Sequence, residues 1–169
     1  MSQQQQEFKQ SYDYHKHNLI YISDYIKFAD AKAGVALSLN LVLLGFLGAE
    51  AKGIGLKNLS LLEVGLYMSL LLLLAAVYIF IWKILWPRYP NSTDYYMSWG
   101  GIATFSTKYD YLNRLKQKCE NEEEFLKDMA IRNYDLARVA TKKYFFLKVG
   151  FIFLTVGGLL GITSYFFSK

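Results

Sequence analysis

The sequence has few of the residues that interrupt helices or crosslink a chain. Its 169 residues include two prolines, Pro87 and Pro90, and one cysteine, Cys119. A single thiol cannot form a disulfide within the chain, which is typical of proteins kept in a reducing cytosol. No proline and no glycine precedes Gly34. The first 33 residues therefore contain no signal that would end a helix.

Motifs of common enzyme classes are also missing. There is no glycine-rich phosphate loop ending in Lys-Ser or Lys-Thr, no nucleophile elbow, and no carboxylate pair inside an apolar run. The two histidines, His15 and His17, lie two residues apart, so they cannot face one metal ion from the same helix. Cys119 has no second cysteine to form a metal or redox motif. We expect no enzyme activity, no metal site and no cofactor.

Charged side chains are absent from long stretches of the chain. Residues 65–82 contain none, and at about 1.5 Å per residue a helix of this length crosses the hydrocarbon of a bilayer. Five consecutive leucines at 70–74 leave no polar face, which disfavours a soluble core helix. Residues 33–49 are uncharged, and residues 144–167 contain only Lys148, which snorkels easily to lipid headgroups from this position. We predict transmembrane helices at 33–49, 64–86 and 144–167. A signal peptide is disfavoured because the polar segment before residue 33 is too long.

The rest of the chain is polar, as a mean hydropathy of only +0.14 requires. Residues 1–7, which include four glutamines, predict a disordered tail. Residues 8–32 predict the cytoplasmic part of a long first helix, and residues 87–143 predict a cytoplasmic helical region. The fold class is therefore all-α, with three transmembrane helices continuous with a cytoplasmic helical bundle, and we expect a homo-oligomer.

Heptad spacing runs along the first helix. One stripe, which we call the seam, follows alternating steps of four and three residues and consists of Phe8, Tyr12, His15, Leu19, Ile22, Ile26, Ala29, Ala33, Ala36 and Asn40. This spacing keeps one face toward partner helices. It predicts a single rod that starts in water and continues into the membrane. In the last span Gly157 and Gly161 have the spacing that permits close helix approach, which hints at packing between copies.

Two further helices are predicted in the polar region. After a connector at 88–101, an apolar stripe predicts a helix at 102–119, and acidic residues at 120–124 favour the start of a last helix at 122. The 102–119 stripe consists of Ile102, Phe105, Tyr109, Leu112 and Leu115. Apolar stripes on helices in water must cover one another. We therefore expect these helices to form the cytoplasmic bundle.

Orientation follows from the positions of Lys and Arg. Residues 83–143 contain eleven basic and eight acidic residues, whereas the turn at 50–62 has only Lys52 and Lys57 as basic residues. By the positive-inside rule, the N-terminus and residues 83–143 are cytoplasmic and the C-terminus is outside. We expect a multi-pass protein of the bacterial inner membrane.

Several short motifs resemble a known family. They are the run Tyr25–Gly34 with its Phe-Ala-Asp-x-Lys-Ala signature, Trp86-Pro87-Arg88, Gly100–Ala103, and Asn133–Tyr144. From about Asn18 to Tyr165 the sequence resembles the transmembrane domain of Pycsar effectors. The resemblance implies an antiphage defence effector that compromises the inner membrane when a nucleotide signal changes. Related stand-alone members include the membrane partner of the Hailong system, which implies a channel held shut by a short DNA oligomer.

The resemblance also implies partners. No separate cyclic-nucleotide-binding domain is recognisable, which disfavours a simple sensor of cyclic mononucleotides. A short single-stranded DNA oligomer is therefore at least as well supported as a cyclic nucleotide, and the enzyme that makes the signal would be a nucleotidyltransferase or a cyclase. Such ligands need cations for phosphates and flat side chains for bases. The candidate ligand-binding residues are Lys108, Tyr109, Tyr111, Arg114, Lys116, Lys118, Arg132 and Arg138. Lys142 and Lys143 are better interpreted as anchors to lipid headgroups.

A conducting path needs polar groups inside the membrane helices. Asn40 lies on the seam with Ser38 nearby, and Lys27, Asp30 and Lys32 lie at the cytoplasmic mouth of the first span. These five residues are candidates for a pore or gate. Asn40 is equally well explained by a hydrogen bond across a helix interface. The charged residues are better explained by ion pairs on the helix surface, with a role in gating as the alternative.

The function expected from these observations is a nucleotide- or oligonucleotide-regulated channel that depolarises the membrane and causes abortive infection. The alternative is a membrane anchor that conducts nothing and recruits a cytoplasmic partner. The sequence does not discriminate between ligands that open the path and ligands that close it.

Overall fold

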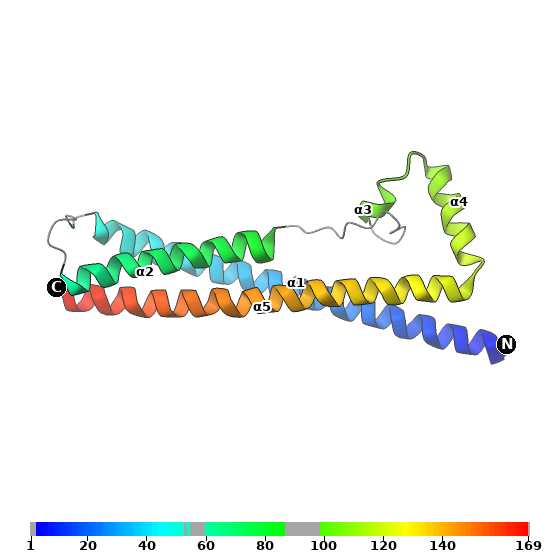
Figure 1. Ribbon diagram of the computed structural model, residues 1–169, viewed down its shortest axis with the longest axis horizontal. Helices are drawn as coiled ribbons and strands as arrows, with labels where there is room; N and C mark the ends of the chain where they lie inside the picture. Colours follow the sequence, from blue (N-terminus) through cyan, green and yellow to red (C-terminus); the bar gives the residue numbers. More distant parts are fainter. Residues whose placement is uncertain (1–2, 53, 55–59, 87–98, 169) are drawn as a thin grey trace. The chain divides into compact units, whose positions relative to one another are not determined.

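The computed structural model describes residues 3–52, 54, 60–86 and 99–168, and this part of the chain contains helices and no strand (Figure 1). In chain order the elements are α1 (Gln3–Ala51), α2 (Leu61–Tyr78), a π-helix η1 (Ile79–Leu85), α3 (Trp99–Ile102), α4 (Lys108–Cys119) and α5 (Glu122–Ser168). Three of the helices are long and apolar enough to cross a membrane. The predicted all-α fold with three such helices is confirmed.

The chain forms two compact units. The polar unit comprises Met1–Tyr25 and Arg88–Val139, and the apolar unit comprises Ile26–Pro87 and Ala140–Lys169. Each unit therefore contains part of α1 and part of α5. The connector expected at 88–101 lies mostly outside the described residues.

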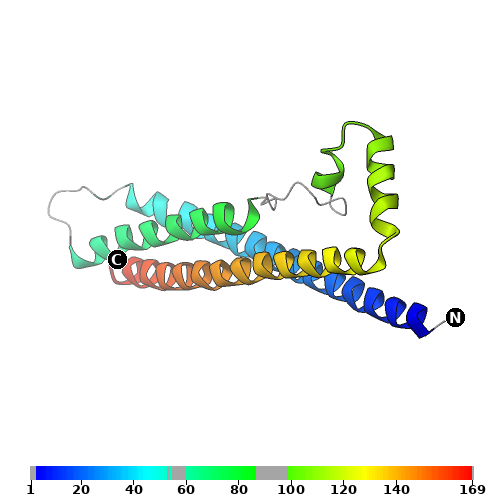
Figure 2. The same cartoon turned by 45° about the vertical axis from the view of Figure 1, so that its right-hand side comes forward.

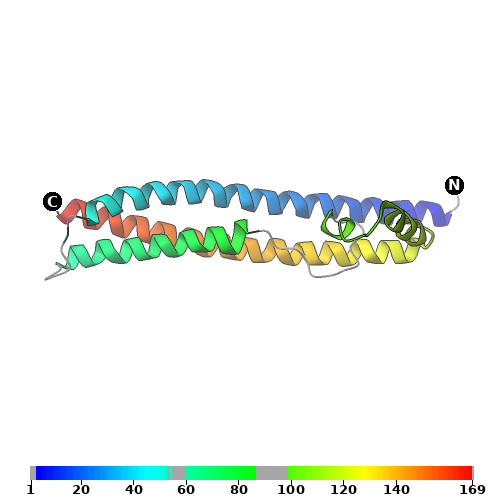
Figure 3. The ribbon, with the colours of Figure 1, turned by 90° about the horizontal axis from the view of Figure 1, so that it is seen from above.

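The apolar unit is a bundle of three helices in which each helix packs against the other two (Figure 3). In this unit the segments of α1 and α5 run in the same direction, and α2 with η1 runs antiparallel to both (Figure 1). The core follows the predicted seam of α1: Ala29, Ala33 and Asn40 have no exposed surface and Ala36 has 3%. Small alanine side chains let neighbouring helices approach closely. From α2, η1 and α5 the core receives Leu66, Leu73, Ala76, Phe80, Ile84, Leu147 and Leu154.

Glycines of α5 receive side chains of the other two helices. A Cβ atom on Gly161 would lie 2.4 Å from the Ser69 Oγ of α2 and equally close to a Leu47 methyl group of α1. Ser69 donates a hydrogen bond to the Gly157 carbonyl at 2.6 Å. The predicted close approach at Gly157 and Gly161 is thus present, but it joins helices of one chain, not two copies.

The second span begins with a capping box and ends in a π-helix. The Ser60 N–H donates to the Glu63 carboxylate at 2.6 Å, and the Glu63 N–H donates to Ser60 Oγ at 3.3 Å. At the other end the Trp86 N–H donates to the Ile81 carbonyl, five residues back, at 2.8 Å. From the sequence we predicted one continuous helix here, because a run of apolar residues does not show where α-helical hydrogen bonds change to π-helical ones.

In the polar unit, α1 and the first half of α5 lie together (Figure 2). The rings of Tyr12 and Phe125 have centroids 6.1 Å apart, and Asn133 Nδ2 donates to the His15 carbonyl at 3.0 Å. His15 is half-buried on the predicted seam. α1 already begins at Gln3, so residues 3–7 are helical where a disordered tail was expected. Gln3 and Glu7 hydrogen-bond one turn apart at 3.2 Å.

The helix predicted at 102–119 is divided. α3 ends at Ile102, and α4 begins at Lys108 after Thr107, whose Oγ1 accepts a hydrogen bond from the Asp110 N–H at 3.1 Å. The predicted end at Cys119 is confirmed. The predicted stripe is wrong at Ile102, Tyr109 and Leu112, which are 39%, 65% and 45% exposed, whereas Phe105 and Leu115 are half-buried. The side of α4 with less exposure carries Tyr111, Arg114, Leu115 and Lys118 instead.

Candidate functional site

The exposed side of α4 carries three of the candidate ligand-binding residues. Lys108, Tyr109 and Lys116 are exposed, and Lys108 Nζ lies 5.2 Å from the centre of the Tyr109 ring. A cation beside an aromatic face is the pairing that binds phosphate and base together. This side of α4 therefore has the chemistry that a nucleotide ligand requires.

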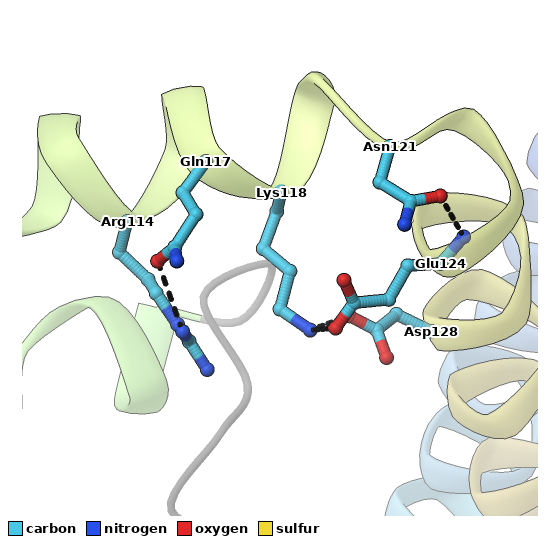
Figure 4. A network of polar contacts seen from close by, with 6 residues as sticks. All are labelled: Arg114, Gln117, Lys118, Asn121, Glu124 and Asp128. Atoms are coloured by element: carbon cyan, nitrogen blue, oxygen red, sulfur yellow. Dashed lines mark hydrogen bonds and ion pairs between the residues drawn. The ribbon is translucent and has the colours of Figure 1, made fainter.

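The other side of α4 is occupied by contacts within the polar unit (Figure 4). Lys118 is buried and forms ion pairs with Glu124 and, at 3.2 Å, with Asp128, both on α5. Arg114 donates to Gln117 Oε1 at 3.3 Å, and the rings of Tyr111 and Phe105 have centroids 5.5 Å apart. Lys118 therefore joins α4 to α5, and its charge is already neutralised by two carboxylates.

The hydrogen bond between Lys118 and Glu124 shifts the pKa values of both side chains. The hydrogen bond to Glu124 raises the pKa of Lys118 above its ordinary value, although partial burial opposes the rise. The same hydrogen bond lowers the pKa of Glu124 below its ordinary value of 4.5. Both groups are therefore charged at neutral pH.

The remaining candidate cations lie on α5. Arg138 is exposed and its guanidinium lies 5.8 Å from the centre of the exposed Tyr134 ring, whereas Arg132 is half-buried. α4 stands away from α5 and approaches it at its C-terminal end (Figures 1 and 2). The predicted residues consequently do not form one cluster. Tyr134, the aromatic partner of Arg138, was missed by the sequence, although its i, i+4 spacing from Arg138 was a usable signal.

The candidate pore residues face different directions in the apolar unit. Asn40 Nδ2 donates to the Leu73 carbonyl of α2 at 3.0 Å. Its Oδ1 is buried without a hydrogen-bond partner among the described residues. Ser38 is exposed and donates to the Gly34 carbonyl at 3.1 Å. The hydrogen bond across a helix interface, one of the two interpretations of Asn40, is thus present within the chain.

The charged residues at the mouth of the first span are divided in the same way. Asp30 forms an ion pair with Lys143 of α5 at 2.5 Å, and Lys143 is only 9% exposed. Lys143 was expected to contact headgroups, and its partner was missed because the two residues are 113 positions apart. Lys27 and Lys32 are exposed, and Lys32 Nζ lies 4.2 Å from the centre of the Phe28 ring.

Metal chemistry finds no support in the part of the chain that the structure describes. No group of three or more His, Cys, Asp or Glu side chains lies there in positions that could hold an ion. Cys119 is exposed and has a free thiol.

Known proteins resemble this chain over most of its length. Residues 14–168 match the family described as Pycsar effector protein domain. The chain belongs to this family. It is 29% identical over 146 residues to the Pycsar effector protein SaPycTM of Staphylococcus aureus, a match that covers 86% of this chain and 88% of that protein. No solved structure matches the chain.

Family membership confirms the resemblance drawn from the short motifs. This Pycsar effector is an antiphage defence protein with membrane helices. Its family is not known for enzymatic activity. The matched region includes almost all of both units, and so it contains the candidate residues of α4 and α5 as well as the spans.

Proposed function

We propose that this effector assembles into homo-oligomers in the bacterial inner membrane and opens a conducting path under the control of a nucleotide signal. Loss of the membrane potential then ends the infection together with the host cell. The observation that carries this proposal is the exposure of the spans. In the most apolar 18-residue segment of each of the three long helices, only 22%, 28% and 33% of the residues, respectively, are buried within the chain. Most of the span surface is thus available to lipid and to other copies.

Control by a nucleotide is supported by the exposed cations and rings of the polar unit. Lys108, Tyr109 and Lys116 on α4, and Arg138 on α5, offer charge for phosphates and a flat face for a base. We propose a cyclic nucleotide as the signal, made by a cyclase or nucleotidyltransferase, because the related protein is a Pycsar effector. We leave Lys118 out of this site because its charge is already paired.

Flux measurements on purified protein test the proposal. The full chain is reconstituted in liposomes with a potassium gradient and a potential-sensitive dye, and cyclic mononucleotides are added one at a time. We expect one of them to change the rate at which the potential is lost. A response to short single-stranded DNA instead would reassign the ligand to the Hailong type. No flux under any nucleotide condition would contradict the channel.

Matched variants locate the ligand site. Neutralising Lys108, Lys116 and Arg138 together by substitution with glutamine should weaken the response to the nucleotide and leave the basal flux unchanged. The control replaces Lys9, Lys16 and Lys127, exposed cations of the same unit outside the candidate site, with glutamine. Harmless accumulation of the wild-type protein in cells, with an unchanged membrane potential, would indicate the non-conducting anchor.

A further inference from the structure

α1 carries a second heptad stripe, separate from the seam. Its first set of positions recurs every seven residues: Tyr14, Tyr21, Phe28, Val35 and Val42, with side chains 54 to 74% exposed. Asn18, Tyr25, Lys32, Leu39 and Phe46 alternate with them; Asn18 is half-buried and the other four are exposed. We call these positions the outer stripe. Apolar and aromatic side chains thus follow one exposed face of α1 in both units.

Helix geometry separates the outer stripe from the seam by about a third of a turn. Each position of the first set follows a seam position by two residues, as Phe28 follows Ile26 and Val35 follows Ala33. Two residues correspond to a rotation of about 200° around the helix. Each position of the second set follows a seam position by three residues, as Leu39 follows Ala36, and so lies about 60° from it. In the apolar unit the seam faces α2 and α5, which lie on one side of α1 (Figure 3). The outer stripe therefore faces out of the unit.

Lipid alone does not account for the outer stripe. Residues 13–24 include Asp13, Lys16, His17 and Asp24, and a segment with this many polar groups belongs in water. The exposed rings of Tyr14 and Tyr21 therefore have no hydrocarbon to cover them. A lipid-facing surface also has no need for steps of three and four residues, whereas helices that supercoil around each other require them.

The occupant must match a face that is aromatic in water and aliphatic in the membrane, in one heptad register. A second copy of α1 in parallel orientation meets this condition, because symmetry places each position opposite itself. We propose that α1 helices of neighbouring copies pack together along the outer stripe. The inference rests on the homo-oligomer of the proposed function and names the face through which it forms.

Two observations near the stripe fit a second copy. An open groove of about 490 Å³ lies beside the stripe. Its lining residues are Phe28, Ala31, Lys32, Val35, Ala36 and Leu39 of α1 and Phe151 of α5. Such a hollow beside a heptad position is where a large side chain of another helix inserts. Asn18 and Lys32 occupy the same inner heptad position in this register, and polar residues at such a position set strand number and alignment. In the assembly Lys32 of each copy faces the shared axis.

Disulfide mapping in membranes tests the interface. Cys119 is replaced by serine, and single cysteines are placed at Tyr21, Phe28 or Val42, or one residue earlier at Ile20, Lys27 or Leu41 as matched controls. Tyr21 and Ile20 are 54% and 53% exposed, so exposure does not separate the two sets. After oxidation, we expect several-fold more disulfide-linked dimer in the first set than in the controls. Equal yields, or higher yields in the controls, would overturn the proposal.

Wild-type protein provides a second measurement that no substitution can disturb. Two differently tagged copies expressed together should co-purify from solubilised membranes, and their failure to do so would also overturn the interface. The outcome is separable from that of the proposed function. Disulfides in the first set without any change in membrane potential would keep the interface and remove the channel. Depolarisation with disulfides only in the control set would keep the channel and remove the interface.

Discussion

At the scale of single residues, Gly161 shows how the apolar unit achieves its close packing. Ser69 and Leu47 reach α5 at the place where a side chain on residue 161 would otherwise stand. The Ser69 hydroxyl also satisfies its hydrogen bond on the Gly157 carbonyl. In hydrocarbon, where water offers no alternative partner, such a contact holds two helices at one spacing.

Substituting Gly161 with alanine should therefore destabilise the protein. We expect a loss of about 1 to 3 kcal/mol, the usual range for extra carbon in a packed core. The matched control is Gly34→Ala, because a Cβ there has nothing within 4 Å. That substitution should be neutral or slightly stabilising, since alanine favours helix over glycine. Thermal unfolding in detergent micelles measures both, and an equal effect of the two substitutions would contradict the packing described for Gly161.

The ion pair between Lys118 and Glu124 makes the stability of the contact between α4 and α5 depend on pH. The folded pKa of Glu124 is lowered, so its contact adds stability above pH 4.5 and loses it as the pH falls through the folded value. The folded pKa of Lys118 is raised above 10.5, so its contribution is complete below that pH and disappears only as the pH rises further. Between these limits the ion pair is fully charged.

Acidification below pH 4.5 should consequently lower the melting temperature of wild-type protein more than that of Lys118→Met. The variant has already lost the ion pair, so protonation of Glu124 there removes only its weaker attraction to Arg114 and Lys127. Circular dichroism in micelles across this pH range provides the measurement, with Lys116→Met as the control for loss of an exposed lysine. Parallel pH curves for wild type and Lys118→Met would show that the ion pair contributes no stability.

At the scale of elements, the Asp30–Lys143 ion pair fastens α1 to α5. Both residues belong to the apolar unit and lie a few positions inside its limits at Ile26 and Ala140. Lys143 is largely buried, and a buried charge that loses its partner is costly. The two helices are therefore held together where they pass between the polar and apolar parts of the sequence.

A double-mutant cycle with Asp30→Asn and Lys143→Met should show a coupling free energy of about 1 to 3 kcal/mol. The exposed pair Asp13 and Lys142, on the same helices, serves as the control and should show no coupling. Unfolding free energies of the four variants in micelles give the result. Strict additivity of the two substitutions would mean that the ion pair does not stabilise the contact of α1 with α5.

A feature of these elements was predictable from the sequence where it depends on residues of one helix, and not where it depends on contacts between helices. The seam of α1 was predicted position by position, because heptad spacing is a property of one helix and its buried alanines lie where the repeat puts them. The start of α4 was missed because Ile102 and Phe105 extend the apolar stripe, while the Thr107 cap was overlooked. The partners of Lys118 and Lys143 were not predictable, since ion pairs between helices depend on tertiary packing.

At the scale of the whole molecule, the chain separates its polar and apolar residues into two units that α1 and α5 both traverse. If all three long helices cross the bilayer, the N-terminal part of the chain and residues 99–143 lie on one side and the turn between α1 and α2 lies on the other. Basic residues concentrate in the former, which predicts that it is cytoplasmic.

Thiol labelling tests this orientation. Cys119 is exposed in wild-type protein and should react with a membrane-impermeant maleimide in inverted vesicles but not in intact spheroplasts. A Lys52→Cys variant on a Cys119→Ser background should show the opposite pattern, since Lys52 is exposed after the end of α1. Labelling of both cysteines from the same side would rule out three crossings.

The π-helix at the end of the second span has a consequence for tolerance to deletion. A hydrogen bond from Trp86 to Ile81 encloses one residue more than an α-helical bond does. Removing one residue from Ile79–Leu85 lets the segment shorten to α-helical register while Trp86 and the residues before Ile79 keep their facing. The same deletion among the leucines at 70–74 has no slack to absorb it and turns the rest of the span by about 100°. The segment Ile79–Leu85 can thus lose one residue without changing the direction in which the neighbouring residues face.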